Sequence, residues 1–226
     1  MLKRLIIFFA LVVFEVPLFA QHTDHYNKRI NQFDSEKQIT SKDIVFLGNS
    51  LTEGGDWAAF FPKINKRLER KGGRIVNRGI VGDDAPGIYE RLYQILPYKP
   101  KKIFLLVGVN DISHHLTADS VANAIAKVVD KIREESPDTK LYMQTLLPIN
   151  ESFKRYKNLN GKTNEVGKVN VLIKKIAKER KLKCIDLYPL FLSNEGVLEP
   201  SITKDGLHIN RQGYNIWIKA IKKYVK

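Results

Sequence analysis

The sequence predicts an α/β fold, a three-layer α/β/α sandwich built around a five-stranded parallel sheet. Short apolar runs alternate with amphipathic stretches from residue 44 to the end of the chain. The runs are continuously apolar instead of alternating with polar residues, which is typical of strands covered on both faces. Strands that alternate with helices favour a parallel sheet with right-handed crossovers. For five strands we expect the flavodoxin-like order 2-1-3-4-5.

Five apolar segments are the predicted strands. Gly48 follows the first of them, and Pro148 closes the fourth. Glycine and proline favour turns, so each of these residues marks the end of a strand. The segments are residues 44–47, 74–77, 102–107, 141–147 and 183–187.

Helices are predicted between these strands and after the last one. Residues 57–71 form one helix that ends at Gly72-Gly73, and residues 85–96 form the next. Residues 21–42, before the first strand, are expected to form a loop or a short helix on the outside. Three more helices each carry an apolar stripe that we expect to face the core. The stripes are Val121, Ile125, Val128 and Ile132; Val166, Val169, Ile173 and Ile176; and Tyr214, Trp217, Ile221 and Tyr224.

The N-terminus resembles a secretory signal peptide. Lys3 and Arg4 precede an apolar run over residues 5–14, and Ala20 offers a small residue at a cleavage site. The run is too short for a stable membrane span. We therefore predict a signal peptide at residues 1–20 and a single domain at residues 21–226, exported to the periplasm or the extracellular space. An uncleaved N-terminal anchor is the alternative.

Charge and cysteine content narrow the possible partners. The formal net charge is +14, but the basic residues are spread over several helices and no nucleic-acid motif is present. Solvated helix faces explain this charge better than nucleic-acid binding does, although such a surface would also attract acidic glycans or lipids. Cys184 is the only cysteine, so no intrachain disulfide can form, and we expect it to be a buried strand residue and not a reactive thiol.

Polar residues and glycines follow several predicted strands. In a sheet of order 2-1-3-4-5 the ends of the first three strands are neighbours, and ligands bind at this edge. We therefore expect four segments to meet there. They are Gly-Asn-Ser-Leu-Thr at residues 48–52, Asn-Arg-Gly-Ile-Val-Gly-Asp at 77–83, Gly-Val-Asn-Asp at 108–111 and Asp-Gly-Leu-His at 205–208.

These residue types are suited to acyl transfer. A serine such as Ser50 becomes a nucleophile when a base takes its proton, and His208 can act as that base near neutral pH. Asp205, three residues earlier, can hold the other ring nitrogen of His208. The tetrahedral intermediate needs donors for its oxyanion, and the candidates are the backbone N–H groups of Ser50 and Gly82 and the side-chain amide of Asn110. This chemistry needs no cofactor and no metal.

The four segments, in this order, resemble the blocks of the SGNH or GDSL hydrolases. The resemblance spans residues 44–217 and implies the SGNH hydrolase fold, with Ser50, Asp205 and His208 as the triad. It also implies that Ser50, Gly82 and Asn110 form the oxyanion hole. Asn49 stands where the family usually has Asp, which suggests a branch near the platelet-activating-factor acetylhydrolase subunits, carbohydrate acetylesterases and lysophospholipase-like esterases.

Several residues near these blocks have a simpler structural interpretation. Ser50 could be only a helix N-cap. We expect Asp83 and Asp111 to be loop or cap residues that brace the oxyanion donors, and Asp84 to be solvated. His114 and His115 could lie at the rim of the pocket, or bind a metal with His22 and His25, but a plain surface loop is favoured. The polar segment 150–161, with Phe153 and Tyr156, is either a wall of the pocket or a surface loop.

The sequence therefore predicts a serine esterase that removes a small acyl group, acetyl in the first instance, from a carbohydrate. The alternatives are a lysophospholipase or thioesterase for longer acyl chains, and a glycan- or lipid-binding domain without turnover. The chain lacks G-x-S-x-G, G-x-x-x-x-G-K-[ST], G-x-G-x-x-G and H-E-x-x-H motifs, so ordinary α/β-hydrolase, phosphate-loop, dinucleotide and zinc-protease functions have no support.

Overall fold

The fold is a twisted parallel sheet between two layers of helices. The structure is a computed structural model that describes residues 23–226, so the predicted signal peptide and His22 lie outside the described residues. The strands run in the order β2-β1-β3-β4-β5 and all four pairings are parallel, which confirms the predicted topology. The strand bounds are β1 Ile44–Gly48, β2 Ile75–Gly79, β3 Lys102–Leu106, β4 Lys140–Gln144 and β5 Lys183–Ile185.

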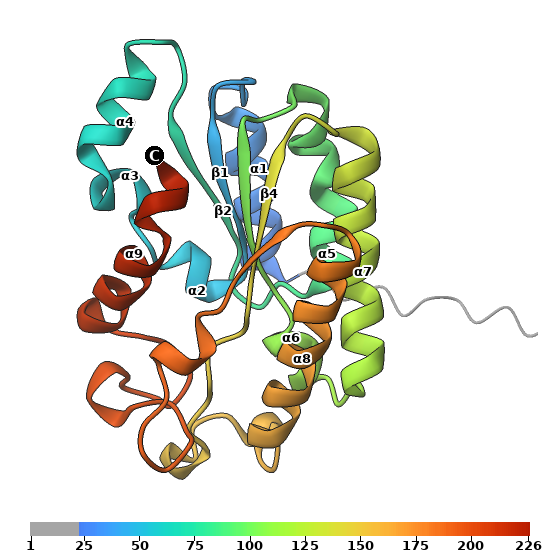
Figure 1. The fold of residues 1–226 in the computed structure, drawn as a ribbon, viewed down its shortest axis with the longest axis vertical. Helices are drawn as coiled ribbons and strands as arrows, with labels where there is room; N and C mark the ends of the chain where they lie inside the picture. Colours follow the sequence, from blue (N-terminus) through green and yellow to red (C-terminus); the bar gives the residue numbers. More distant parts are fainter. Residues whose placement is uncertain (1–22) are drawn as a thin grey trace, which may run out of the picture.

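Helices cover both faces of the sheet (Figure 1). α3, α4 and α9 lie on one face, and α5, α7 and α8 lie on the other. α2 and α6 are short helices at the carboxyl ends of β1 and β3, and α1 packs beside α5 through a 3.2 Å hydrogen bond from the Tyr26 hydroxyl to the Gly87 carbonyl. The helix bounds are α1 Asp24–Ser35, α2 Ser50–Glu53, α3 Trp57–Phe60, α4 Pro62–Glu69, α5 Ala85–Glu90, α6 Val109–Ser113, α7 Ala118–Glu135, α8 Thr163–Glu179 and α9 Arg211–Val225.

Alternate residues of β1 face opposite layers, as the period of a strand requires. Val45 and Leu47 belong to the core under α5, α7 and α8. Ile44 and Phe46 belong to the core under α3, α4 and α9, where the Phe46 ring stacks on Trp57 at a centroid distance of 4.0 Å. Both faces of the strand are therefore buried, and this is the reason for its continuous apolar run.

Two predicted helices are shorter than expected. The helix predicted over residues 57–71 is split at Phe61 because Pro62 starts a new helix, α4. The helix predicted over residues 85–96 ends at Glu90, and two 3-10 turns follow at Arg91–Gln94 and Leu96–Tyr98. Before the first strand, the segment predicted as a loop or short helix contains the three-turn helix α1.

The fourth and fifth strands also end earlier than predicted. β4 ends at Gln144. The Thr145 N–H still donates to the Ile185 carbonyl at 3.2 Å, but the Leu146 N–H donates to a side chain, Asn170 Oδ1, at 2.7 Å. β5 ends at Ile185, and the Leu187 N–H donates to Thr145 Oγ1 at 2.8 Å. Cys184 lies half-buried in β5, and burial raises the pKa of its thiol to about 11, so the thiol is protonated at neutral pH.

Within residues 23–226, no helix is both long enough and apolar enough to span a bilayer.

Candidate active site

Ser50 is the first residue of α2, directly after β1. The helix is capped by Asn49, whose Oδ1 accepts from the Leu51 N–H at 3.1 Å, so the alternative that Ser50 serves only as an N-cap is wrong. The Ser50 hydroxyl does not cap the helix, and it lies 2.9 Å from His208 Nε2. The Tyr214 hydroxyl of α9 donates to the Leu51 carbonyl at 2.8 Å and holds the helix from the other side.

Asp205 and His208 share one tight loop before α9. Asp205 Oδ1 accepts from the backbone N–H groups of Leu207 and His208 at 3.0 and 2.8 Å, and Asp205 Oδ2 lies 2.8 Å from His208 Nδ1. Partial burial opposes ionisation of Asp205, but the hydrogen bonds from His208, Leu207 and Tyr156 outweigh it and lower the pKa of Asp205 to about 2. The result is an ionised carboxylate, an imidazole and a hydroxyl in one hydrogen-bonded chain.

Gly206 allows this loop to pack closely against the segment that follows β4. Its φ is +82°, and a Cβ there would lie 2.1 Å from the Asn150 carbonyl oxygen. The Asn150 N–H donates to the Gly206 carbonyl at 2.7 Å. A side chain at residue 206 would therefore push the His208 loop away from residue 150.

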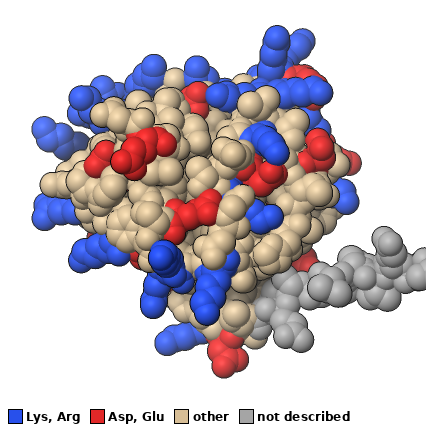
Figure 2. All heavy atoms as spheres, turned by 90° about the horizontal axis from the view of Figure 1, so that it is seen from below, with Lys and Arg blue, Asp and Glu red and all other residues tan. Residues whose placement is uncertain are grey.

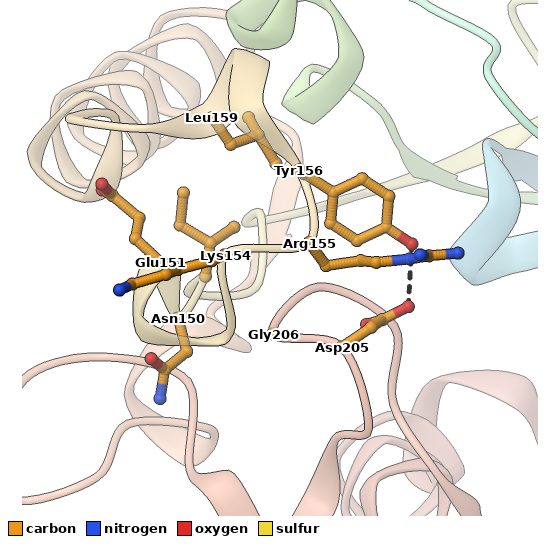
Figure 3. A pocket seen from close by; sticks show the side chains of 9 residues that line it. Asn150, Glu151, Lys154, Arg155, Tyr156, Leu159, Asp205 and Gly206 are labelled. Carbon is orange, nitrogen blue, oxygen red and sulfur yellow. Dashed lines mark hydrogen bonds between the residues drawn. The ribbon is translucent and has the colours of Figure 1, made fainter.

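Tyr156 is a site residue whose contacts the sequence did not predict. Its hydroxyl donates to Asp205 Oδ2 at 2.8 Å and lies 3.0 Å from His208 Nδ1. The segment 150–161 thus forms a wall next to the Asp205–His208 pair, and a small pocket lies between them (Figure 3). A pocket wall was one of the two interpretations of this segment that the sequence allowed. Nothing in the sequence indicated that Tyr156 would contact both Asp205 and His208.

The two remaining candidate donors, Gly82 and Asn110, lie on neighbouring segments. Asn110, in the first turn of α6, donates from Nδ2 to the Asp83 carbonyl at 2.7 Å, which places it one residue from Gly82. Gly82 has a φ of +81°, and no atom lies within 4 Å of the position a Cβ would take. The Ile80 N–H donates to the Gly48 carbonyl at 3.1 Å and ties this loop to the end of β1, two residues before Ser50.

A buried network braces these donors. Arg91 contacts Asp83 Oδ2 through Nη2 at 2.7 Å and Nε at 2.8 Å, and its Nη2 also donates to the Gly48 and Arg78 carbonyls. Asp111 accepts from the Ala85 N–H at 3.2 Å. Asp83 and Asp111 thus take part in bracing, as expected.

Asp84 differs from the prediction. It was expected to be solvated, but it is buried, and its Oδ1 accepts from the Gly87 N–H at 2.8 Å as the N-cap of α5. The cap satisfies a backbone donor in the first turn of the helix, which explains the burial of a carboxylate.

Glu53 is a second residue that the sequence did not point to. It lies on α2, three residues after Ser50, and its Oε2 accepts from the Val81 N–H at 2.6 Å. His25 Nε2, at 3.0 Å, and Arg29 Nε, at 3.6 Å, bring α1 to the same carboxylate. The carboxylate therefore joins α1, α2 and the loop that carries Gly82.

The two adjacent histidines are surface residues. His114 is exposed, and its Nδ1 lies 3.4 Å from Asp84 Oδ2; His115 is exposed and has a φ of +63°. Among residues 23–226, no three His, Cys, Asp or Glu side chains are grouped as metal ligands.

Comparison with known proteins identifies a family and several relatives of this chain. The model of the GDSL-like lipase/acylhydrolase family matches residues 46–216. The platelet-activating factor acetylhydrolase IB subunit alpha2 of Rattus norvegicus is 26% identical over 196 residues, which cover 86% of this chain and 80% of that protein. The human alpha2 subunit shows the same identity and coverage.

Solved structures share the fold. A GDSL-like lipase from Bacteroides thetaiotaomicron superposes with a TM-score of 0.73 at 24% identity and covers 88% of this chain and 96% of its own. An acetyl xylan esterase superposes with a TM-score of 0.66 at 23% identity and covers 81% of this chain and 100% of its own.

Proposed function

Because this chain belongs to the GDSL-like lipase/acylhydrolase family and is therefore an ester hydrolase, we propose that it works through an acyl-enzyme on Ser50. The observation that carries the proposal is the hydrogen-bonded chain Ser50–His208–Asp205, with distances of 2.9 and 2.8 Å. A serine, an imidazole and a carboxylate in this order are the parts that nucleophilic acyl transfer needs.

In the first step, His208 Nε2 takes the proton of Ser50 while Oγ attacks the ester carbonyl. The oxyanion is stabilised by the backbone N–H groups of Ser50 and Gly82 and by Asn110 Nδ2. Asn110 Nδ2 carries two hydrogens and donates one of them to the Asp83 carbonyl, so the other is available to the substrate. The imidazolium then protonates the leaving alcohol, and the C–O bond breaks to leave the acyl group on Ser50.

In the second step, water attacks the acyl-enzyme. His208 takes a proton from the water, the same donors hold the second oxyanion, and the proton returns to Ser50 as the carboxylic acid leaves. Asp205 remains ionised throughout because its pKa is lowered to about 2, and it stabilises the imidazolium in both steps.

For the substrate, we propose a small acyl group, acetyl, on a carbohydrate. Two kinds of similar protein support a small acyl group: acetylhydrolase subunits in sequence and an acetyl xylan esterase in structure.

The acyl-length test compares p-nitrophenyl acetate with p-nitrophenyl octanoate. We expect a higher kcat/KM for acetate, and a clear preference for octanoate would overturn the acetyl proposal in favour of the long-chain alternative. A fluorophosphonate probe tests the chemistry itself. Labelling of Ser50 is expected, and its absence would favour a binding domain without turnover.

Arg155 suggests that the carbohydrate is acidic. Its guanidinium lies beside the Tyr156 hydroxyl, above Asp205 (Figure 3). It is exposed and has no ion-pair partner among residues 23–226, while the nearby carboxylates of Asp205 and Glu151 already accept several hydrogen bonds. The Tyr156 hydroxyl is a neutral hydrogen-bond partner of Arg155, so an anionic group of the substrate could approach this guanidinium without competing with a carboxylate of residues 23–226.

The face of the molecule at the carboxyl ends of the strands carries both signs of charge. Figure 2 shows Lys and Arg side chains around its outline and acidic side chains among them and within the face. A uniformly basic face would bind any polyanion, but this one favours discrimination by a few placed cations such as Arg155.

Arg155→Gln tests this preference, with acetylated polygalacturonate and acetylated xylan as the acidic and neutral substrates. We expect a loss of about 5-fold in kcat/KM on the acidic substrate only, as for an exposed ion pair. Arg70→Gln, in the exposed turn after α4, is the matched control. An equal loss on both substrates would show that Arg155 does not recognise the charge of the substrate.

Export and cleavage before Gln21 are part of the same proposal. They are checked by expressing the full chain and determining the N-terminus and mass of the protein found outside the cytoplasm. Recovery only in uncleaved, membrane-bound form would support the N-terminal anchor instead.

A further inference from the structure

Three polar atoms form a triangle at the base of the active site. The Tyr156 hydroxyl is 2.8 Å from Asp205 Oδ2 and 3.0 Å from His208 Nδ1, and these two atoms are 2.8 Å apart. The Tyr156 ring meets the imidazole edge to face at a centroid distance of 5.7 Å. The hydroxyl therefore contacts both members of the Asp–His pair from the side opposite Ser50.

The number of hydrogens on these three polar groups limits which of them can donate to which. Asp205 is ionised and can only accept, whereas a hydroxyl can donate one hydrogen and accept others. The Tyr156 hydrogen points to Asp205, because a carboxylate is a stronger acceptor than a neutral imidazole nitrogen. A lone pair of the Tyr156 oxygen then faces His208 Nδ1.

An unprotonated Nδ1 would be surrounded by acceptors in this arrangement. It would face Asp205 Oδ2 and the Tyr156 oxygen, with no hydrogen to share with either. A protonated Nδ1 can donate to both. The triangle thus favours the neutral tautomer with hydrogen on Nδ1, in which Nε2 carries the lone pair that faces Ser50.

We propose that Tyr156 is a positioning residue that holds His208 in the tautomer able to accept the proton of Ser50. The inference deepens the proposed function and rests on it, because His208 acts as a base only there. Tyr156 does not touch the reacting atoms; it acts through His208 and Asp205.

The segment that carries Tyr156 is anchored at both ends. The Glu151 carboxylate accepts from the Thr163 N–H and hydroxyl at 2.7 and 2.6 Å and also from the Gly161 N–H, which closes the loop on itself. The Asn150 side chain donates to the Leu198 carbonyl at 3.0 Å. These bonds fix the path of the loop, so Tyr156 is held against the Asp–His pair and is not carried on a free segment.

The ionisation states of the groups that face His208 suit this role. Burial, then the hydrogen bond to Asp205 and its charge, raise the pKa of Tyr156 to about 12, although Arg155 opposes the shift. Tyr156 therefore keeps its hydrogen at any pH at which the enzyme would work. The other groups close to His208 are Asp205, which is ionised, and Ser50, which is neutral.

Tyr156→Phe tests the inference because it removes the hydroxyl and keeps the ring. We expect kcat on p-nitrophenyl acetate to fall about 10-fold, the usual size for a hydrogen bond to a charged group, with little change in KM. In ¹⁵N spectra of histidine-labelled protein at pH 8, the fraction of His208 with hydrogen on Nδ1 should also fall. Tyr93→Phe, at an exposed tyrosine outside the site, is the matched control and should change neither.

A second variant separates positioning from local folding. Glu151→Gln weakens the anchor of the loop without touching Tyr156, so it should lower kcat and the Nδ1–H fraction together, but by less than Tyr156→Phe. An unchanged kcat in Tyr156→Phe, or a fall in kcat with an unchanged tautomer fraction, would overturn the inference. If the wild type had no esterase activity and no probe labelling, the proposed function would fail, while the ¹⁵N spectra would still report on Tyr156.

Discussion

Asp111 and Asp205 lie on opposite sides of the same site, and their carboxylates are held in opposite ways. Asp111, in the oxyanion half (the side of the site with Gly82 and Asn110), is fully buried and accepts from the Ala85 N–H, at 3.2 Å, and from its own backbone N–H, with Asp84 nearby. Burial, followed by the charge of Asp84, raises the pKa of Asp111 to about 7. Asp205, with a side chain 23% exposed, receives four hydrogen bonds, and its pKa is lowered to about 2.

The difference shows that burial and the number of donors together decide whether a carboxylate at this site keeps its charge. In the proposed mechanism Asp205 must stay ionised to stabilise an imidazolium, and the loop around it supplies the donors. Asp111 has a bracing task that a neutral carboxyl can also perform. The oxyanion half depends on a buried network, and the Asp205–His208 half depends on loops at the surface. Substitutions in the first half should therefore affect folding, and those in the second should affect turnover.

Ser50→Ala tests the Asp205–His208 half and has the largest expected effect on turnover. We expect kcat/KM to fall by at least about 10⁴-fold, because a nucleophile has no substitute. The melting temperature should stay nearly the same, since the Ser50 hydroxyl contacts only His208 among residues 23–226. Esterase assays and thermal unfolding check both parts, with Ser35→Ala on α1 as the control. A collapse of folding would mean that Ser50 is structural.

Arg91→Met is the corresponding test of the first half. It leaves Asp83 buried without its ion pair, so we expect a loss of about 3–5 kcal/mol in the free energy of unfolding. Arg180→Met is the control because its ion pair with Asp130 lies at the surface, where the loss should be at most about 1 kcal/mol. Urea unfolding measures both, and equal losses would contradict the contrast between the two halves.

Asn110→Ala is expected to affect both turnover and folding. It removes one oxyanion donor, and we expect kcat to fall by about 10²–10³-fold with KM nearly unchanged. Stability should fall as well, because the bond from Asn110 to the Asp83 carbonyl is lost. Steady-state kinetics beside urea unfolding would show both effects. A normal kcat would exclude Asn110 from the oxyanion hole.

Asp111→Asn tests the opposite titration of the two aspartates. Since the pKa of Asp111 is raised in the folded state, the folded state binds more protons between about pH 4 and 7. Its contribution to stability is present below the unfolded pKa and is lost as the pH rises through 7. Asp111→Asn should therefore flatten the pH dependence in this window and stabilise the protein at pH 8 by on the order of 1 kcal/mol.

Asp205→Asn is the control for that measurement. The pKa of Asp205 is lowered by folding, so its contribution is present above the unfolded pKa and disappears as the pH falls toward 2. The variant should leave the slope between pH 5 and 8 unchanged. Urea unfolding over this range checks both variants, and a slope altered by Asp205→Asn but not by Asp111→Asn would contradict the assignment.

Much of the fold and the core of the site were predictable because they depend on local pattern. Continuous apolar runs predicted buried strands, and five such strands alternating with helices led to the expectation of the flavodoxin-like order. The order in turn placed Ser50 and Asn110 at neighbouring strand ends. Pro62 marks the break between α3 and α4, but the prediction of one helix over residues 57–71 did not take this proline into account.

The residues that the sequence missed act across loops. Tyr156 reaches Asp205 over a separation of 49 residues, and Glu53 reaches Val81 over 28. Asp84 was misjudged because a carboxylate is ordinarily solvated, and only the start of α5 above it supplies the donor that permits burial.

The sequence by itself predicted the layered sheet, its strand order and the four segments that meet at its edge. Strand period and glycine positions are properties of short stretches of chain, and the strand order is a common one for five parallel strands that alternate with helices. The tertiary structure alone decided which side chains surround the Asp205–His208 pair and how strongly each aspartate holds its proton. Those properties depend on the distances between segments remote in the chain and on the water that their packing excludes, and neither is encoded in any one segment.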